Sequence, residues 1–442
     1  MRRSLVETVV PARLGTSFRW LLGSSWISNI GDGIVIAAGP LLVASETREP
    51  FLVALAAVLQ YLPWPIFGLF AGVVADRVDR RRLVAVANCC RVVVLLVLVA
   101  TILSGEVSIV VILSAIFLLG VAETFADTTT STLMPMLVAK RDLGIANARI
   151  MTGIVTLNQL AGPPIGAVLF GLGRSFPFVT QAVCVALSVL MVLRLQLPEH
   201  GRPRTGRQKR GRRKRGRRKR GREQTGAPAS IRKDILEGMR WVWGHAAVRT
   251  LVLTIVIFNV TFGAAWSVLV LYSLDRLGMG QIGFGLLTTA MACGGILGTV
   301  SYGWLERHVS LGNIMRVGLV IETLTHLVLA VNTLPWVAMA VFFVFGAHAF
   351  IWGTTSTSVR QRAVPTHVQG RVASVYMIGV TGGMVLGSLL GGLIASRWGV
   401  TAPFWFAFVG SAVFLVLIWR QLVHVAHADE EIVAHEQVGG PE

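Results

Sequence analysis

The stretch GLFAGVVADRVDRRRLV, residues 68–84, sets two aspartates and four arginines between two apolar runs. A helix of about 20 apolar residues crosses a bilayer, because the hydrocarbon core is ~30 Å thick and a helix rises ~1.5 Å per residue. The charges therefore fit a short connection at a membrane surface, and the glycine at 72 lets two helices approach closely just before it. We interpret residues 68–84 as the end of one membrane span and the start of the next.

Outward from this connection, apolar runs of the same kind recur along the whole chain. The 442 residues have a mean hydropathy of +0.67, and only 14% of them are charged. We predict an all-α polytopic membrane protein with twelve transmembrane helices in two pseudo-symmetric six-helix bundles. The predicted spans are 18–44, 51–75, 83–103, 107–133, 146–171, 176–197, 248–273, 281–304, 312–332, 335–357, 372–396 and 401–423.

The net charge of +19 is concentrated in one stretch between spans six and seven. Residues 201–222 contain 14 lysines and arginines and no acid, so the rest of the chain carries only +5. The repeat GRQKRGRRKRGRRKRG at 206–221 has no interleaved aromatic side chains on which bases could stack, which argues against nucleic-acid binding. We predict a self-repelling connection, and contact with anionic lipid headgroups is a plausible addition.

Lysine and arginine near the span ends also predict orientation and domain organisation. One set of connections holds most of them (Arg77, Arg80, Arg81, Arg82, Lys140, Arg141, the basic stretch, Arg307, Arg360, Arg362), and the other set holds few (Arg48, Arg174, Arg276, Arg397). Basic connections stay in the cytoplasm, so both termini are expected there, and the chain is expected in the cell inner (plasma) membrane.

The spans also predict the domain organisation. Residues 1–198 and 247–424 are expected to form the two bundles, 199–246 the linker and 425–442 a cytoplasmic tail.

Weak internal repeats support two related halves. The sequence TTST occurs at 129–132 and again at 354–357, an offset of 225 residues. Gly162 and Gly166 match Gly387 and Gly391 at the same offset, and an offset of 226 pairs 68 and 72 with 294 and 298. Such duplication is typical of transporters.

The charge order at 72–81 resembles the loop signature of the major facilitator superfamily. Its pattern is G-x-x-x-D-R-x-x-R-R, carried here by Gly72, Asp76, Arg77, Arg80 and Arg81. The resemblance implies the major facilitator fold and a charge latch that closes the cytoplasmic side in one state. The family usually has glycine where this chain has Asp79. The second half lacks this charge order, so the latch is expected to be asymmetric.

Further stretches are similar to the macrolide-efflux and enterobactin-exporter group of proton-coupled exporters. They are residues 123–149, 162–171 and 232–245. Gly162, Pro163 and Gly166 resemble the core of the span-five antiporter motif, whose upstream glycines are replaced by Arg149 and Asn158. The resemblance implies a secondary active transporter that exports a drug, macrolide-like compound, siderophore or secondary metabolite in a proton-driven cycle. Its partners would be the small-molecule substrate, protons and the bilayer.

Ionisable residues inside spans are costly and are therefore candidate sites. Asp32 lies 13 residues past Arg19, about 20 Å along the helix, and is a candidate proton or cation site, with bonding to nearby Ser and Asn side chains such as Asn29 as the alternative. Arg91 and Glu123 are predicted at similar depth on adjacent spans, as a structural ion pair or a proton relay. Asp127, one turn away, competes with Glu123 for that arginine.

Other polar and aromatic residues are candidates for a substrate cavity. Asn29, Trp64, Asn158, Asn259 and Trp266 are expected to line it. Glu322 and His326, four residues apart, share a helix face and are predicted to pack or to hydrogen-bond to each other rather than to form a proton path.

The sequence gives no sign of an enzyme, a metal site or a cofactor site. None of the five lysines follows a glycine, so no phosphate-cradling G-K-[ST] loop exists, and the nine histidines and four cysteines are scattered. We expect a monomeric transporter. A transport-inactive membrane sensor or interaction protein, or an importer of a small metabolite, is the alternative.

Overall fold

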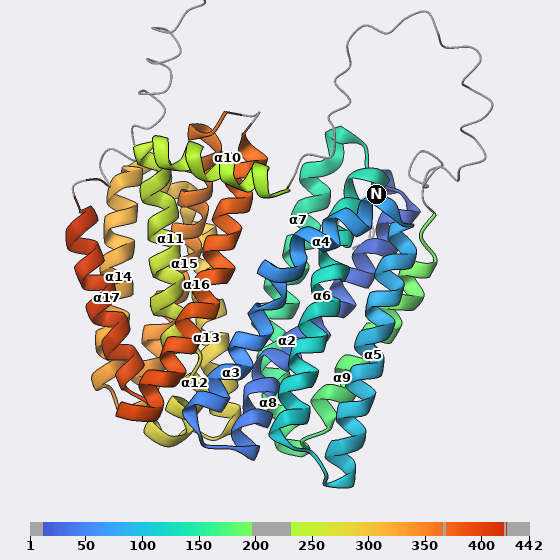
Figure 1. Cartoon of the computed structure of the whole chain (residues 1–442), viewed down its shortest axis with the longest axis horizontal. Helices are drawn as coiled ribbons and strands as arrows, with labels where there is room; N and C mark the ends of the chain where they lie inside the picture. The colour runs from blue at the N-terminus through green and yellow to red at the C-terminus, as the bar shows by residue number, and fades with distance from the viewer. Residues whose placement is uncertain (1–11, 197–230, 366–367, 420, 422–442) are drawn as a thin grey trace, which may run out of the picture.

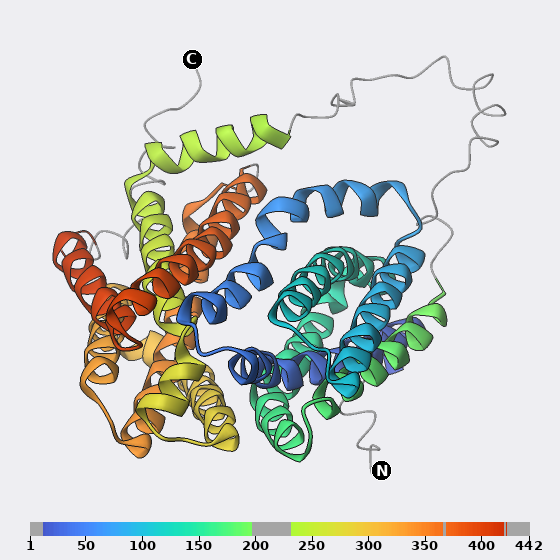
Figure 2. The same ribbon diagram turned by 60° about the horizontal axis from the view of Figure 1, so that its bottom comes forward.

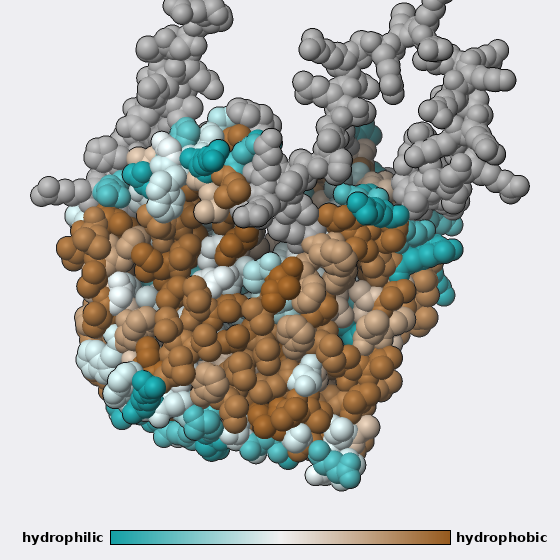
Figure 3. Space-filling model, in the orientation of Figure 1, coloured by the Kyte–Doolittle hydropathy of each residue, from teal (hydrophilic) through white to brown (hydrophobic). Residues whose placement is uncertain are grey.

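The structure is a computed structural model that describes residues 12–196, 231–365, 368–419 and 421. The basic stretch at 206–221 and the predicted C-terminal tail lie outside these residues. On the face seen in Figure 3, a broad apolar band lies between two more polar rims. Eleven helical stretches among the described residues are long and apolar enough to cross a membrane, and the twelfth predicted span is a helix of 17 residues, α17 (Ala402–Ile418). The predicted all-α polytopic membrane fold is confirmed.

The N-terminal bundle contains six spans, two of them interrupted. Span one is α2 (Thr16–Glu46), span three is α5 (Arg80–Ser104), span four is α6 (Ile109–Leu137) and span six is α9 (Phe176–Leu193). Span two consists of α3 (Pro50–Tyr61) and α4 (Pro63–Arg77), which meet where Pro63 removes a helical hydrogen bond. Span five consists of α7 (Leu143–Gly153), the π-helical segment η3 (Ile154–Ala161) and α8 (Gly162–Leu172).

The C-terminal bundle repeats this arrangement. Its spans are α11 (Ala246–Trp266), α13 (Gln281–His308), α14 (Leu311–Val331), α15 (Pro335–Ala363), α16 (Gln369–Trp398) and α17. Span seven is shorter than the predicted 248–273, because the short segments α12 (Leu269–Leu271) and η5 (Tyr272–Arg276) follow α11 as separate turns. A further helix, α10 (Ile231–Gly244), precedes α11 within the predicted linker and crosses the end of the bundle (Figure 1).

Two of the glycine matches coincide with equivalent helix crossings. A Cβ added at Gly166 would lie 1.9 Å from the carbonyl oxygen of Ile34, so α8 and α2 touch backbone to backbone. A Cβ added at Gly391 would lie 2.2 Å from the carbonyl oxygen of Ala264, where α16 crosses α11. Span five therefore packs on span one as span eleven packs on span seven. The expected close approach at Gly72 is wrong for this conformation, since its nearest neighbour, a Thr128 methyl, is 4.0 Å away.

The two bundles meet at one end and diverge toward the other (Figures 1 and 2). We call the diverging end, where α4 meets α5 and where α10 lies, the basic end. Near the opposite end α3 packs on α16 and α8 packs on α13. There Arg48 Nη1 lies 2.9 Å from Asp275 Oδ1, and the Ser396 hydroxyl donates to Glu49 Oε1 at 2.7 Å. Both interactions join one bundle to the other.

Candidate functional site

The main cavity lies between the bundles and has a volume of about 760 Å³. Turns of α6 and α7 near the basic end line it, together with the basic end of α16. A second cavity of about 340 Å³ extends toward the opposite end. The side chains that line both cavities are Asp32, Arg91, Glu123 and Asn158. These four residues form a polar layer that separates the two compartments.

The arginine of this layer is bound to Asp32, not to Glu123. Arg91 on α5 is only 2% exposed, and its guanidinium forms an ion pair with the Asp32 carboxylate of α2. It also lies 3.5 Å from the Ser28 hydroxyl and 3.4 Å from Asn88 Oδ1. The expectation of a direct Arg91–Glu123 pair is therefore wrong, because the rotations of α2 and α5 turn Asp32 toward the guanidinium.

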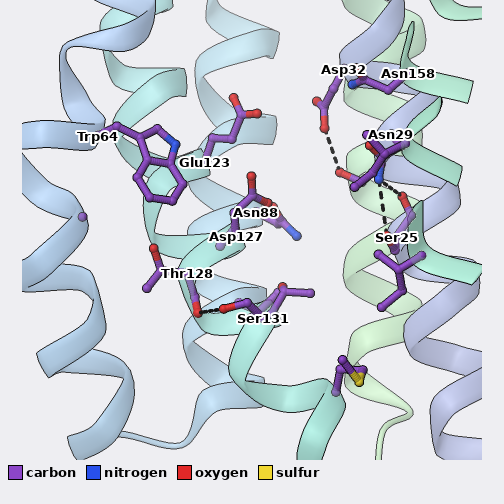
Figure 4. A pocket seen from close by; sticks show the side chains of 18 of the residues that line it. Ser25, Asn29, Asp32, Trp64, Asn88, Glu123, Asp127, Thr128, Ser131 and Asn158 are labelled. Atoms are coloured by element: carbon purple, nitrogen blue, oxygen red, sulfur yellow. Dashed lines mark hydrogen bonds between the residues drawn. The ribbon is translucent and has the colours of Figure 1, made fainter. Parts of the chain in front are cut away.

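Asp32 has a complete set of donors. Besides Arg91, the Gln181 amide of α9 donates to its Oδ1 at 3.1 Å and the Ser28 hydroxyl donates to its Oδ2 at 3.2 Å. The alternative expectation, that Asp32 bonds to nearby Ser and Asn side chains, is confirmed for the serine. Asn29 instead donates to the Ser25 carbonyl at 2.8 Å (Figure 4). The charge of Asp32 is thus compensated by one buried cation and two polar groups.

The glycines on either side of Asp32 do not leave space beside it. A Cβ at 31 would lie 2.9 Å from Cys184 Cβ, and one at 33 would lie 2.4 Å from the carbonyl oxygen of Asn158. These two positions therefore offer no room for water or substrate. Asn158 belongs to the π-helical segment η3, whose wide turn places a main-chain carbonyl against α2. Only glycine at 33 accommodates that carbonyl.

Glu123 and Asp127 stand on the cavity side of α6, one turn apart. Figure 4 shows both carboxylates directed into the main cavity, with Trp64 of α4 beside Glu123. Among the described residues, neither carboxylate has a hydrogen bond or an ion pair. Of the described residues that line either cavity, Arg91 is the only arginine or lysine, and it already binds Asp32. The cavity wall therefore carries two carboxyl groups that have no hydrogen-bond or ion-pair partner among the described residues.

Three of the five predicted cavity residues line the main cavity, namely Asn29, Trp64 and Asn158. Trp266 lines the second cavity and stacks on Phe262 at 5.1 Å between ring centroids. The prediction for Asn259 is wrong: it is 6% exposed and donates to the Ile255 carbonyl of its own helix at 2.7 Å. A polar residue in a predicted span does not by itself show how its helix is rotated, and so does not show whether the side chain faces the cavity.

Glu322 and His326 are buried in the C-terminal bundle, away from both cavities. Glu322 accepts a hydrogen bond of 3.4 Å from Thr261, and neither ring nitrogen of His326 has a partner. Of the two predicted alternatives, packing is the one that the structure shows, and the two residues do not hydrogen-bond to each other.

The motif between spans two and three forms a local charge cluster at the basic end. Arg80 Nη2 lies 2.7 Å from Asp76 Oδ1, and Arg81 donates to the Leu195 carbonyl at 3.0 Å beyond α9. Arg77 is exposed in the last turn of α4. Asp79, which departs from the usual glycine, caps α5 by accepting from the Arg82 amide at 3.1 Å. In this conformation the motif acts within one bundle.

A chain of two six-helix bundles, with charged side chains inside the N-terminal one, matches a known family. The family model described as Major Facilitator Superfamily matches residues 21–381 and 285–437. The chain belongs to the major facilitator superfamily. It is a secondary transporter, not an enzyme, and its substrate is a small molecule.

Distant relatives are efflux proteins. The chain is 25% identical over 408 residues to the multidrug efflux pump Tap of Mycolicibacterium fortuitum, which covers 87% of this chain and 90% of the relative. It is 25% identical over 413 residues to the enterobactin exporter EntS of Salmonella typhi, covering 91% and 92%. It is 20% identical over 400 residues to macrolide efflux protein A of Streptococcus pyogenes, covering 89% and 92%. The predicted relationship to macrolide-efflux and enterobactin-exporter proteins is confirmed.

Solved structures agree on the fold. The chain superposes with a TM-score of 0.68 and 12% identity on a bacterial homologue of the human lysosomal transporter Spinster in an inward-facing, unoccupied conformation. The match covers 94% of this chain and 97% of that one.

Proposed function

We propose that this transporter exports small amphipathic cations from the cytoplasm in exchange for protons, by alternating access in the cell inner membrane. The excess of lysine and arginine supports a cytoplasmic basic end. The bundles diverge there and are joined at the opposite end, and with a cytoplasmic basic end this arrangement would be the inward-facing state. A compound would enter the main cavity from the cytoplasm and leave through the opposite end after the bundles rock.

The observation that carries this proposal is the pair of carboxyl groups of Glu123 and Asp127 on the wall of the main cavity, neither with a hydrogen bond or ion pair among the described residues. A carboxylate in a partly dry cavity binds either a proton or an organic cation, because each neutralises it. Two ligands that compete for the same charge are exchanged across the membrane when the site alternates between its two sides. Trp64 next to Glu123 offers an aromatic face to a cation.

We propose that the ion pair between Asp32 and Arg91 breaks and re-forms as protons and substrate exchange. Glu123 lines both cavities, as Arg91 does, so the guanidinium has a second carboxylate within the same polar layer. Protonation of Asp32 would release Arg91 toward Glu123, and the reverse transfer would restore the observed pair. We therefore assign proton coupling to Asp32 and Glu123 together, with Asp127 as a contributor to cation binding.

The relatives support export as the direction of transport. Their names describe a drug efflux pump, a macrolide efflux protein and an enterobactin exporter. The acidic wall favours a cationic drug-like compound over an anionic one, because the latter would meet two like charges in a low-dielectric space.

The test is uptake into everted vesicles under an imposed pH gradient, with ethidium as the probe cation. The wild type should accumulate the cation only when the lumen is acidic. Glu123→Gln should lose most of this accumulation while it retains exchange of ethidium down its own gradient. The matched control is Glu106→Gln, an exposed acid in the connection before α6, which should behave as wild type.

Three results would overturn parts of the proposal. Full accumulation by a Glu123→Gln, Asp127→Asn double variant would remove both carboxylates from the mechanism. Gradient-driven movement of substrate in the other direction would identify an importer. Absence of any flux from a folded wild-type protein, across a panel of cationic and neutral probes, would favour the transport-inactive alternative.

A further inference from the structure

One face of α10 is fixed to the basic end of α16. A Cβ added at Gly238 would lie 2.9 Å from the carbonyl oxygen of Arg371, so the two helices cross closely. Glu237 Oε2 lies 2.9 Å from Arg371 Nη1. Val242 is buried in an apolar cluster that includes Val368 and Val372. These contacts make α10 move with the first turns of α16.

The other face of α10 is apolar and uncovered. Leu236, Met239 and Trp243 are 47%, 49% and 62% exposed, and their spacing of three and four residues places them on one side of the helix. Arg240 is also exposed and lies beside this stripe. We call Leu236, Met239, Arg240 and Trp243 the α10 stripe. Three adjacent large apolar side chains on one helix face are too many to be left in water without a partner.

The position of α10 indicates the partner. The helix ends at Gly244, and the next membrane span begins at Val248, four residues or about 6 Å later. It runs across the basic end of the C-terminal bundle and along its outer edge (Figures 1 and 2). An amphipathic helix at this level lies where lipid headgroups meet acyl chains, and tryptophan and arginine are typical of that layer.

We propose that the α10 stripe binds the headgroup layer of an anionic phospholipid bilayer. The sequence just before α10 carries 14 lysines and arginines between residues 201 and 222 and no acid, which complements an anionic surface. Apolar insertion and basic attraction are the two signals that stable surface binding requires. Because α10 packs on α16, which contacts α3 and α4 of the other bundle, a lipid bound to α10 would restrain a helix at the contact between the bundles.

The test uses the full chain in nanodiscs of phosphatidylcholine, alone or with about a third phosphatidylglycerol. The four native cysteines are replaced by alanine, and Met239→Cys carries an environment-sensitive fluorophore. Addition of phosphatidylglycerol should reduce quenching by aqueous acrylamide several-fold and increase quenching by nitroxide-labelled lipid. The same label at Asn313→Cys, an exposed position in the first turn of α14, should not respond.

Two further variants connect the response to the stripe. Trp243→Ser should abolish the protection of position 239, and Arg240→Gln should weaken its dependence on anionic lipid about fivefold. Trp304→Ser is the matched control, since Trp304 is 58% exposed near the basic end of α13 and should leave the protection unchanged. Acrylamide access at 239 that equals access at 313 in both bilayers would overturn the proposal, because the stripe would then face water or another protein. Equal protection in both bilayers would overturn it too, because the anionic headgroup would have no role.

Discussion

Arg91 of α5 and Asp32 of α2 form an ion pair in which the arginine is 2% exposed and the aspartate side chain 18%. The pair lies between two cavities and joins two spans that are not neighbours in the sequence. A buried cation without its partner is strongly unfavourable, so this contact fixes both helices as well as the charge distribution of the site.

Removal of either charge should therefore destabilise the fold. We expect Asp32→Asn to lower the free energy of unfolding by at most about 3–5 kcal/mol, because it removes the observed partner of the buried Arg91. Transfer of the guanidinium to Glu123 would recover part of this loss. Thermal unfolding in detergent measures the change. A double variant, Asp32→Asn with Arg91→Gln, should recover part of the loss. Asp76→Asn is the control, since its carboxylate is 70% exposed and its loss should change stability little. A single variant as stable as wild type would show that the pair contributes nothing to the fold.

The same substitution should abolish coupling. Asp32→Asn mimics the protonated carboxylate and removes the group that holds Arg91, so net export driven by a pH gradient should stop. Exchange of substrate down its own gradient should continue in the fraction that folds. Vesicle efflux with and without the pH gradient separates the two activities. Full gradient-driven efflux by this variant would assign coupling to Glu123 or Asp127 alone.

The glycine at 166 is predicted to tolerate no side chain. Its added Cβ would lie 1.9 Å from a main-chain oxygen of α2, so Gly166→Ala must separate two helices and should cost about 1–3 kcal/mol. Gly171→Ala in the same helix is the control, because its nearest neighbour is the Gln281 side chain at 3.6 Å. Folded yield and unfolding temperature should fall only for position 166. Equal yields would show that α8 can shift freely on α2.

The contact between Arg48 and Asp275 should bias the conformational equilibrium without holding the fold. Both side chains are about half exposed, so the pair contributes at most ~1 kcal/mol, or about a fivefold change in the ratio of the two states. Asp275→Asn should raise the reactivity of a cysteine at position 53, in the second cavity, toward reagents added from the opposite end. Glu46→Gln is the control, since its partner Arg174 belongs to the same bundle. A larger rise in cysteine reactivity for Glu46→Gln than for Asp275→Asn would contradict the role of the Arg48–Asp275 contact in the conformational equilibrium.

Asp76→Asn tests the latch implied by the loop motif. Asp76 pairs with Arg80 four residues away, and among the described residues this is its ion pair, within one bundle. Any contribution across the bundles must therefore come from another state. We expect normal membrane levels and slower alternation, measured as cysteine accessibility from each side. An unchanged state balance with unchanged flux would exclude a latch role.

The membrane spans, the family and the charged residues inside the spans could be predicted from the sequence. Apolar runs of about 20 residues must become helices in lipid, because unpaired backbone groups are too costly there, and this fixed the number and order of the spans. The loop motif with Gly72 and Asp76 identified the family, and the glycines at 162 and 166 marked a real crossing. Asp32, Arg91, Glu123 and Asp127 were recognisable because charges inside spans are rare.

Only the tertiary structure decided which of these charges meet. An apolar sequence with polar residues on several sides does not determine how a membrane helix is rotated, since lipid and protein interiors are equally apolar. Rotation placed Arg91 on Asp32, turned Glu123 into the cavity and buried Asn259. The π-helical turn at Asn158 depends on the space that Gly33 leaves in another span, which no local pattern encodes. The sequence determined the helices and their charges, and the packing between helices determined the site.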